Sequence, residues 1–235
     1  MRIRRTLGTA ALAAAATLAA GTVAPAQAAG ATAPAAGTVA VLTHTAPGTL
    51  GGPNVSVGDV LAADLVSGTT ANFYSSATGT TGIKCATSAF SATVITNPAA
   101  PGTATESLNT QTFGSCTANV IGVTGVQSIT VNNLAYVNSV SDAAGFPVSL
   151  DPGTAGPVQT TVVLKTILGT ITCVYRSPGG LAGTTNNTGQ TIGFTAQALP
   201  KSSGPSTCFP VGYFSATYGP VRDVSVAGNP VVYVN

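Results

Sequence analysis

Short runs of alternating apolar and polar residues, separated by turn-forming clusters, cover most of the chain. Residues 170–175 and 213–218 show this alternation, which directs one set of side chains to a core and the other to water. No segment beyond residue 36 combines a sustained helical period with capping residues. The pattern predicts extended runs at residues 38–43, 60–66, 71–75, 82–86, 90–96, 103–113, 117–123, 126–131, 135–140, 157–168, 170–176, 191–196, 213–218 and 231–234.

Glycine, proline and asparagine clusters separate these runs, for example at residues 51–54, 151–153 and 177–180. Many short strands at turn-punctuated spacing are typical of antiparallel sandwiches and barrels. The predicted fold class is therefore all-β: an antiparallel β-sandwich or barrel-like domain with two disulfide-stapled hairpins. Residues 37–235 suit one such domain, or two similar lobes that share a core.

Four cysteines, Cys85, Cys116, Cys173 and Cys208, frame two stretches of similar length, each of which reads as strand, turn and strand. The two ends of a hairpin lie side by side, at a separation that a disulfide can bridge. This argument favours the pairs Cys85–Cys116 and Cys173–Cys208, although four cysteines allow three pairings. Zinc binding is disfavoured because no two cysteines have the close spacing of a zinc site.

The N-terminus has the order of a secretory signal peptide. Basic residues in 1–5 precede an uncharged alanine-rich stretch, which ends in the small-residue segment 26–28. We expect cleavage after Ala28, a short mobile leader at residues 29–36, and no membrane anchor after signal removal. Arg4 and Arg5 also permit twin-arginine export, so the export route stays open. The expected location is secreted and extracellular, where disulfides persist.

Removal of the signal peptide changes the charge balance, because three of the eight basic residues leave with it. Five basic residues then face six acidic ones, and the exported chain is close to neutral. Its lysines and arginines are scattered along the sequence. Nucleic acid and anionic membrane surfaces are therefore disfavoured as partners, since both attract clustered basic residues.

Several segments together resemble a group of uncharacterised secreted proteins of actinobacteria. The resemblance rests on residues 97–103, 123–126, 161–164, 173–176, 202–208 and 214–220. It covers most of the expected mature chain and implies export. It implies no activity and no catalytic residues.

Candidate catalytic chemistry is sparse. His44 is the single histidine, and no Gly-x-Ser-x-Gly motif supplies a nucleophile for it, so we interpret it as a residue at the end of a strand. Asp59 and Asp64 are an odd number of residues apart on one predicted strand, which would point them to opposite faces. Asp142 and Asp151 adjoin turns, where aspartate commonly closes a local hydrogen bond. The prediction is no enzyme, no catalytic residue, no cofactor and no metal site.

The expected function is a non-catalytic structural or interaction module at the cell envelope or in the extracellular space. Weakly charged strands with exposed edges can add to a neighbouring sheet, so self-association or an envelope component are the expected partners. The alternative is a glycan-binding module that uses tyrosine and asparagine side chains. A secreted hydrolase is the third possibility.

Overall fold

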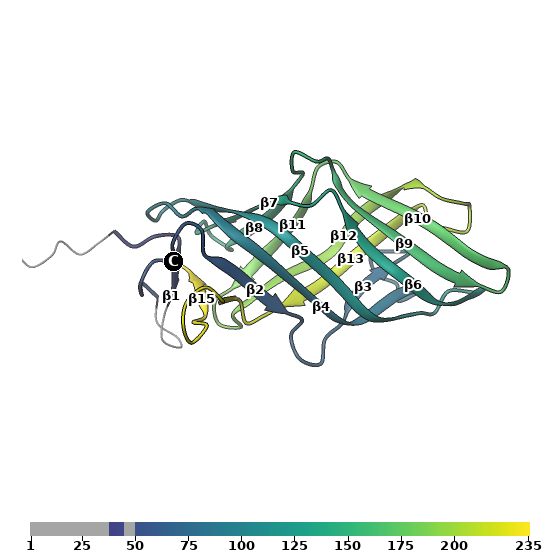
Figure 1. Ribbon diagram of the computed structural model, residues 1–235, viewed down its shortest axis with the longest axis horizontal. Coiled ribbons are helices and arrows are strands. Elements are labelled where there is room, and N and C mark those ends of the chain that lie inside the picture. The colour runs from purple at the N-terminus through teal and green to yellow at the C-terminus, as the bar shows by residue number, and fades with distance from the viewer. Residues whose placement is uncertain (1–37, 45–49) are drawn as a thin grey trace, which may run out of the picture. The chain divides into compact units, whose positions relative to one another are not determined.

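A closed ring of antiparallel strands dominates the computed structural model, which describes residues 38–44 and 50–235 (Figure 1). The predicted signal peptide and leader lie outside the described residues. Residues 38–235 form one unit. The strands are β1 (Leu42–His44), β2 (Val60–Asp64), β3 (Ala71–Tyr74), β4 (Gly82–Thr96), β5 (Thr103–Ala118), β6 (Val123–Asn132), β7 (Tyr136–Ser141), β8 (Pro147–Asp151), β9 (Val158–Thr166), β10 (Gly169–Ser177), β11 (Leu181–Asn186), β12 (Thr191–Ser203), β13 (Val211–Tyr218), β14 (Arg222–Asp223) and β15 (Val232–Val234).

Eight strands close the barrel in the order β11, β8, β7, β5, β4, β3, β13 and β12, and β12 pairs back to β11. Strand β12 also pairs with β10 through its C-terminal half, which extends the wall through β9 to β6. Every strand pairing is antiparallel among the described residues. The prediction of an all-β, barrel-like fold is confirmed.

Alternation along the two longest strands explains how the barrel fills its interior. On β4, residues such as Phe90, Ala92 and Val94 are buried, and the residues between them are more exposed. Strand β5 follows the same period at Ala104, Glu106 and Leu108. These side chains point to the common core because successive residues of a strand face opposite sides.

Bulges shift this alternation part-way along the β4–β5 pair. The register passes from Ala92 opposite Leu108 to Ser91 opposite Thr110, so one extra residue of β5 is left unpaired. A single extra residue inverts which side chains face inward. Beyond the bulge, Gln111 and Phe113 are the β5 residues that line the interior.

The disulfides join Cys85 to Cys116 and Cys173 to Cys208, as predicted. Cys85 lies directly opposite Cys116 in the β4–β5 hairpin. The second disulfide is arranged differently: Cys173 lies on β10, and Cys208 lies in the loop between β12 and β13. Pairing of Val174 with Ser203 brings these two segments together. Two disulfides fit an oxidising environment.

A small two-stranded sheet, β1 with β15, lies at the left-hand end in Figure 1, where the C-terminus is also found. The β9–β10 hairpin lies at the opposite end of the barrel. Among the described residues, no helix is long and apolar enough to cross a membrane.

Candidate functional site: an apolar cavity inside the barrel

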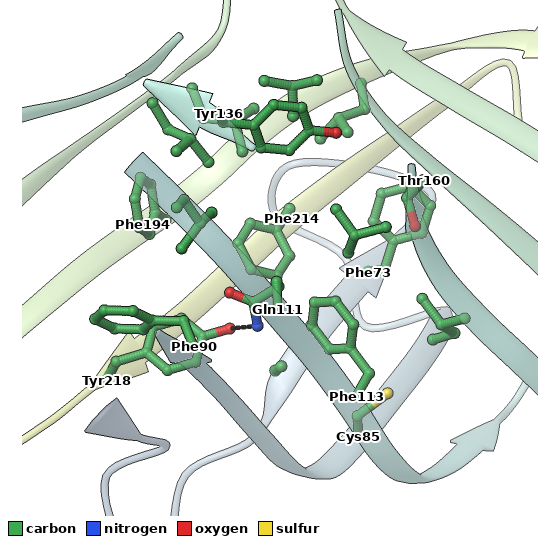
Figure 2. A pocket seen from close by; sticks show the side chains of 18 of the residues that line it. Phe73, Cys85, Phe90, Gln111, Phe113, Tyr136, Thr160, Phe194, Phe214 and Tyr218 are labelled. Atoms are coloured by element: carbon green, nitrogen blue, oxygen red, sulfur yellow. Dashed lines mark hydrogen bonds between the residues drawn. The ribbon is translucent and has the colours of Figure 1, made fainter. Parts of the chain in front are cut away.

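The barrel interior contains a partly open cavity of about 100 Å³, lined by residues from strands all round the ring (Figure 2). Strands β3, β4 and β5 contribute one side, and β12 and β13 contribute another. Strands β6 and β9 of the extended wall also reach it. Its lining is mainly aromatic and aliphatic, and the aromatic members are Phe73, Phe90, Phe113, Tyr136, Phe194, Phe214 and Tyr218.

The aromatic rings are held mostly edge to face. The Phe90 and Tyr218 ring centres are 5.4 Å apart, and those of Phe113 and Phe214 are 6.1 Å apart. Phe194 lies 6.3 Å from Phe214 in a tilted arrangement. Edge-to-face pairs stabilise each other beyond simple burial. The rings therefore form a preorganised wall.

Gly212 on β13 makes room for this wall. A Cβ atom at Gly212 would overlap the ring of Phe73, which packs directly over the glycine backbone. Phe73 in turn meets Tyr175 edge to face, with ring centres 4.8 Å apart. A glycine in a strand interior commonly marks such a close approach.

Gln111 supplies the central polar group of the cavity, and Figure 2 shows its carboxamide among the aromatic rings. Its Nε2 donates hydrogen bonds to the Tyr218 hydroxyl at 3.0 Å and to Ser88 Oγ at 2.8 Å. The Ser88 hydroxyl donates to the Thr112 carbonyl oxygen, so the Tyr218 hydroxyl is the donor in its 2.9 Å contact with Ser88. The amide is therefore held in one orientation.

The cavity presents a neutral surface. Burial raises the pKa of Tyr218 to about 12, against the smaller opposing effect of its hydrogen bonds with Ser88 and Gln111. Burial also raises the pKa of Tyr136, whose hydroxyl donates to the Asn132 carbonyl oxygen. Both tyrosines are therefore protonated at neutral pH. The cavity can accommodate an apolar molecule and satisfy one or two hydrogen bonds.

A second, smaller cavity of about 30 Å³ lies beside Glu106. The Glu106 carboxyl is buried and accepts a 2.7 Å hydrogen bond from Asn138 Nδ2. Burial raises the pKa of Glu106 to about 7, and the hydrogen bond from Asn138 offsets only part of this. Asn138 also lines the larger cavity, so this pair lies between the two cavities.

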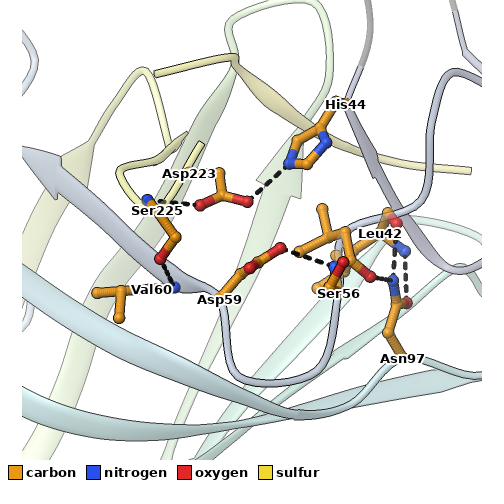
Figure 3. Close-up of polar contacts among 9 residues, drawn as sticks. Leu42, His44, Ser56, Asp59, Val60, Asn97, Asp223 and Ser225 are labelled. Atoms are coloured by element: carbon orange, nitrogen blue, oxygen red, sulfur yellow. Dashed lines mark hydrogen bonds and ion pairs between the residues drawn. The ribbon is translucent and has the colours of Figure 1, made fainter. Parts of the chain in front are cut away.

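A polar cluster forms at the end of the barrel that carries β1 and β15 (Figure 3). His44 Nε2 lies 2.8 Å from Asp223 Oδ2, and Asp223 is completely buried. Asp223 Oδ1 accepts a hydrogen bond from the Ser225 backbone N–H, and Asp59 Oδ2 accepts one from the Ser56 N–H. His44 is thus the last residue of β1, as predicted, but it has a carboxylate partner.

The side chains of His44, Asp59 and Asp223 each offer one ligand atom, and these atoms lie within 4.8 Å of one another. Imidazole and carboxylate are ligand types that several divalent cations accept. The hydrogen bonds of Asp223 and Asp59 also account for their positions without an ion. The arrangement ties β1 to β14, segments far apart in the sequence.

Substitution of His44 by alanine is expected to lower the free energy of unfolding by about 3 kcal/mol, because it leaves the buried Asp223 carboxylate without its side-chain partner. Urea unfolding at neutral pH measures this difference. Asp64→Asn is the control, since Asp64 is exposed on β2 and lies outside the cluster of His44, Asp59 and Asp223. Equal stability of His44→Ala and the unmodified protein would contradict the importance of the pair.

The other residues considered from the sequence remain apart from these sites. Asp142 accepts hydrogen bonds from the Gly102 N–H, and Asp151 accepts one from Ser149 Oγ. Asp64 is exposed on β2. Four tyrosines are buried, and the partly exposed pair is Tyr74 and Tyr213, directly opposite each other on β3 and β13.

No family model, curated protein or solved structure matches this chain.

Proposed function

We propose that this chain is an exported, non-catalytic binding protein whose barrel interior takes a small, largely apolar molecule. The observation that carries this proposal is the 100 Å³ cavity with its wall of aromatic rings. Eight-stranded barrels are just wide enough either to be filled by side chains or to hold one small ligand. A well-formed apolar pocket with a few convergent polar groups is the typical form of a small-molecule site.

Export is supported by two independent features. The four cysteines are all paired in disulfides, which persist in oxidising compartments. Residues 1–28 have the order of a signal peptide, although they lie outside the described residues. Secretion into the extracellular space is therefore part of the proposal.

The proposed ligand has roughly the size of benzene, because an apolar protein cavity somewhat larger than this one, of about 150 Å³, is known to stay dry and to bind benzene. It should also carry one hydrogen-bond donor, such as a hydroxyl group. The Gln111 Nε2 group is engaged with Tyr218 and Ser88, so the Gln111 carbonyl oxygen is the acceptor toward which a ligand hydroxyl would point. A small aromatic or branched aliphatic alcohol meets both requirements.

The glycan-binding alternative would use the Tyr74 and Tyr213 pair. These rings lie on neighbouring strands and are partly exposed, which is the arrangement that an aromatic platform for a sugar needs. Retention on a polysaccharide resin without binding of small alcohols would favour this alternative over the cavity.

Enlarging Leu108 to phenylalanine is expected to fill part of the cavity and to weaken the binding of benzyl alcohol at least tenfold. Leu108 lines the cavity and is buried, so the added ring occupies the space that the ligand needs. NMR titration of the purified protein with benzyl alcohol gives the affinity. The stability of the variant should be maintained or increased, because the added carbon atoms fill existing space.

Leu164→Phe is the matched control. Leu164 is buried but does not line this cavity, so the same enlargement should preserve binding and cost about 1–3 kcal/mol through overpacking. Absence of saturable binding of both benzyl alcohol and toluene to the unmodified protein would contradict the proposal. Equal affinity of Leu108→Phe and the unmodified protein would place the binding elsewhere.

A further inference from the structure

Three large apolar side chains project fully into solvent at one end of the barrel. Ile121 is 102% exposed, Ile167 is 81% exposed and Leu168 is 99% exposed. Scattered single apolar residues are normal on a protein surface, but a cluster of protruding ones marks an interaction site. We call these three residues the apolar tip.

The members of the apolar tip come from two different turns that the sheet brings side by side. Ile121 lies in the β5–β6 turn, and Ile167 and Leu168 form the β9–β10 turn. Strands β6 and β9 are paired, with Val123 opposite Thr166, so both turns lie at the same end. In Figure 1 this is the right-hand end, opposite β1 and β15.

Both turns are held firmly by hydrogen bonds. The Thr166 hydroxyl donates to the Gly169 carbonyl oxygen at 2.8 Å and accepts from the Leu168 N–H at 3.2 Å. The Val123 N–H donates to the Val120 carbonyl oxygen at 3.0 Å across the other turn. The apolar side chains are therefore presented on ordered backbone.

The residue types are unusual for their positions. Asparagine, aspartate and glycine are preferred in two-residue hairpin turns, yet Ile167 and Leu168 occupy the two central positions of the β9–β10 turn. Their apolar character is why the sequence pattern predicts strands that continue to residues 123 and 168. None of the three side chains of the apolar tip belongs to the hydrophobic core. Sites where a local rule fails are often functional.

Charge at this end is positive. Lys165 lies one residue before Thr166 on β9, and Lys84 lies near the start of β4 opposite Thr117; both are exposed. The four loops at this end, residues 75–81, 119–122, 167–168 and 204–210, contain no acidic residue. Asp59 and Asp223 lie instead beside His44 at the other end. Folding thus places Lys84 and Lys165 toward the same end of the barrel, on β4 and β9.

We propose that the apolar tip inserts into the surface of an anionic lipid bilayer, with Lys84 and Lys165 facing the headgroups. Shallow insertion of apolar side chains combined with lysine attraction to anionic lipid is a general mode of peripheral membrane binding. A protein partner fits less well, because a specific interface buries about 800 Å² per partner, and three side chains on protruding turns present much less. This proposal is independent of the cavity.

Cosedimentation with phosphatidylcholine vesicles containing phosphatidylglycerol tests it. The purified protein should bind these vesicles, and Ile121→Ser/Ile167→Ser/Leu168→Ser should reduce the partition coefficient at least a hundredfold. Ile95→Ser is the matched control, because Ile95 is exposed near the end of β4 that carries no tip residue, and it should bind like the unmodified protein. Benzyl alcohol binding should be unchanged in the triple variant.

Lys84→Gln/Lys165→Gln should weaken binding to the same vesicles roughly tenfold and reduce its dependence on salt. Failure of the unmodified protein to bind, or equal binding by the triple variant, would overturn the proposal. Concentration-dependent self-association that the triple variant abolishes, without vesicle binding, would assign the tip to a second copy of this chain and would equally overturn it.

Discussion

Replacement of Cys173 and Cys208 together by serine is expected to lower the free energy of unfolding by about 4 kcal/mol. The two cysteines are 35 residues apart, and a cross-link of that length restricts the unfolded chain by about this amount on the chain-entropy model. The disulfide also fixes the loop between β12 and β13 to β10. Denaturant unfolding measures the loss, and hydrogen exchange should show residues 204–210 opening more readily.

The Cys85→Ser/Cys116→Ser variant is the comparison. Its cross-link spans 31 residues, so the unfolded chain gains similar freedom, but the β4–β5 ladder continues to hold the two segments in register. Local hydrogen exchange should therefore change less than in the first variant. Non-reducing peptide mapping checks the connectivity directly. A peptide linking Cys85 to Cys173, or a loss below about 1 kcal/mol, would contradict the account.

Replacement of Glu106 by glutamine is expected to stabilise the protein by about 3 kcal/mol at pH 8. The pKa of Glu106 rises from 4.5 to about 7 in the folded state because the carboxyl is buried. The folded protein therefore binds a proton more tightly than the unfolded chain does. The stability that protonation of Glu106 contributes is fully present below pH 4.5 and is lost as the pH rises through about 7.

A glutamine at position 106 stays neutral and can accept the hydrogen bond from Asn138. Unfolding curves from pH 4 to pH 8 should therefore be flatter for Glu106→Gln, with little difference between the two proteins at the acidic end. Asp64→Asn is the control, because Asp64 is exposed on β2 and its removal should alter stability little. A less stable Glu106→Gln protein at pH 8 would show that the charged carboxylate is favoured in the fold.

The alternation of apolar and polar residues predicts most strands because the barrel separates an inner face from an outer one. It misses β8 and β11, which contain turn-forming residues such as Pro147 and Gly183. These segments become strands because neighbours in the closed ring complete their hydrogen bonds. Local composition cannot show that a distant strand is available as a partner.

Some residues of the candidate sites could be placed from the sequence, and others could not. Glu106 shares the inward phase of Ala104 and Leu108, so its burial could have been predicted from the period of the strand. Gln111 and Phe113 face inward only because a bulge inverts the phase, which requires the pairing with β4. The contact of His44 with Asp223 joins residues 179 positions apart and needs the folded chain.

At the apolar tip, the sequence pattern predicts strand residues where the structure has exposed turns. Apolar residues predict burial, so the patterns at residues 117–123 and 157–168 predict continuous strands. The structure ends β5 at Ala118 and β9 at Thr166, and places the remaining apolar residues in solvent. Hydrophobicity indicates that a side chain will be covered, but the covering surface can be another molecule.

A crystal structure of the protein exposed to xenon and, separately, to benzyl alcohol shows whether the barrel interior binds a small apolar molecule. We expect xenon inside the aromatic wall near Phe90, Phe113 and Phe214, and benzyl alcohol there with its hydroxyl directed to the Gln111 carbonyl oxygen. An interior filled by repacked side chains, with neither probe bound among these rings, would contradict this expectation.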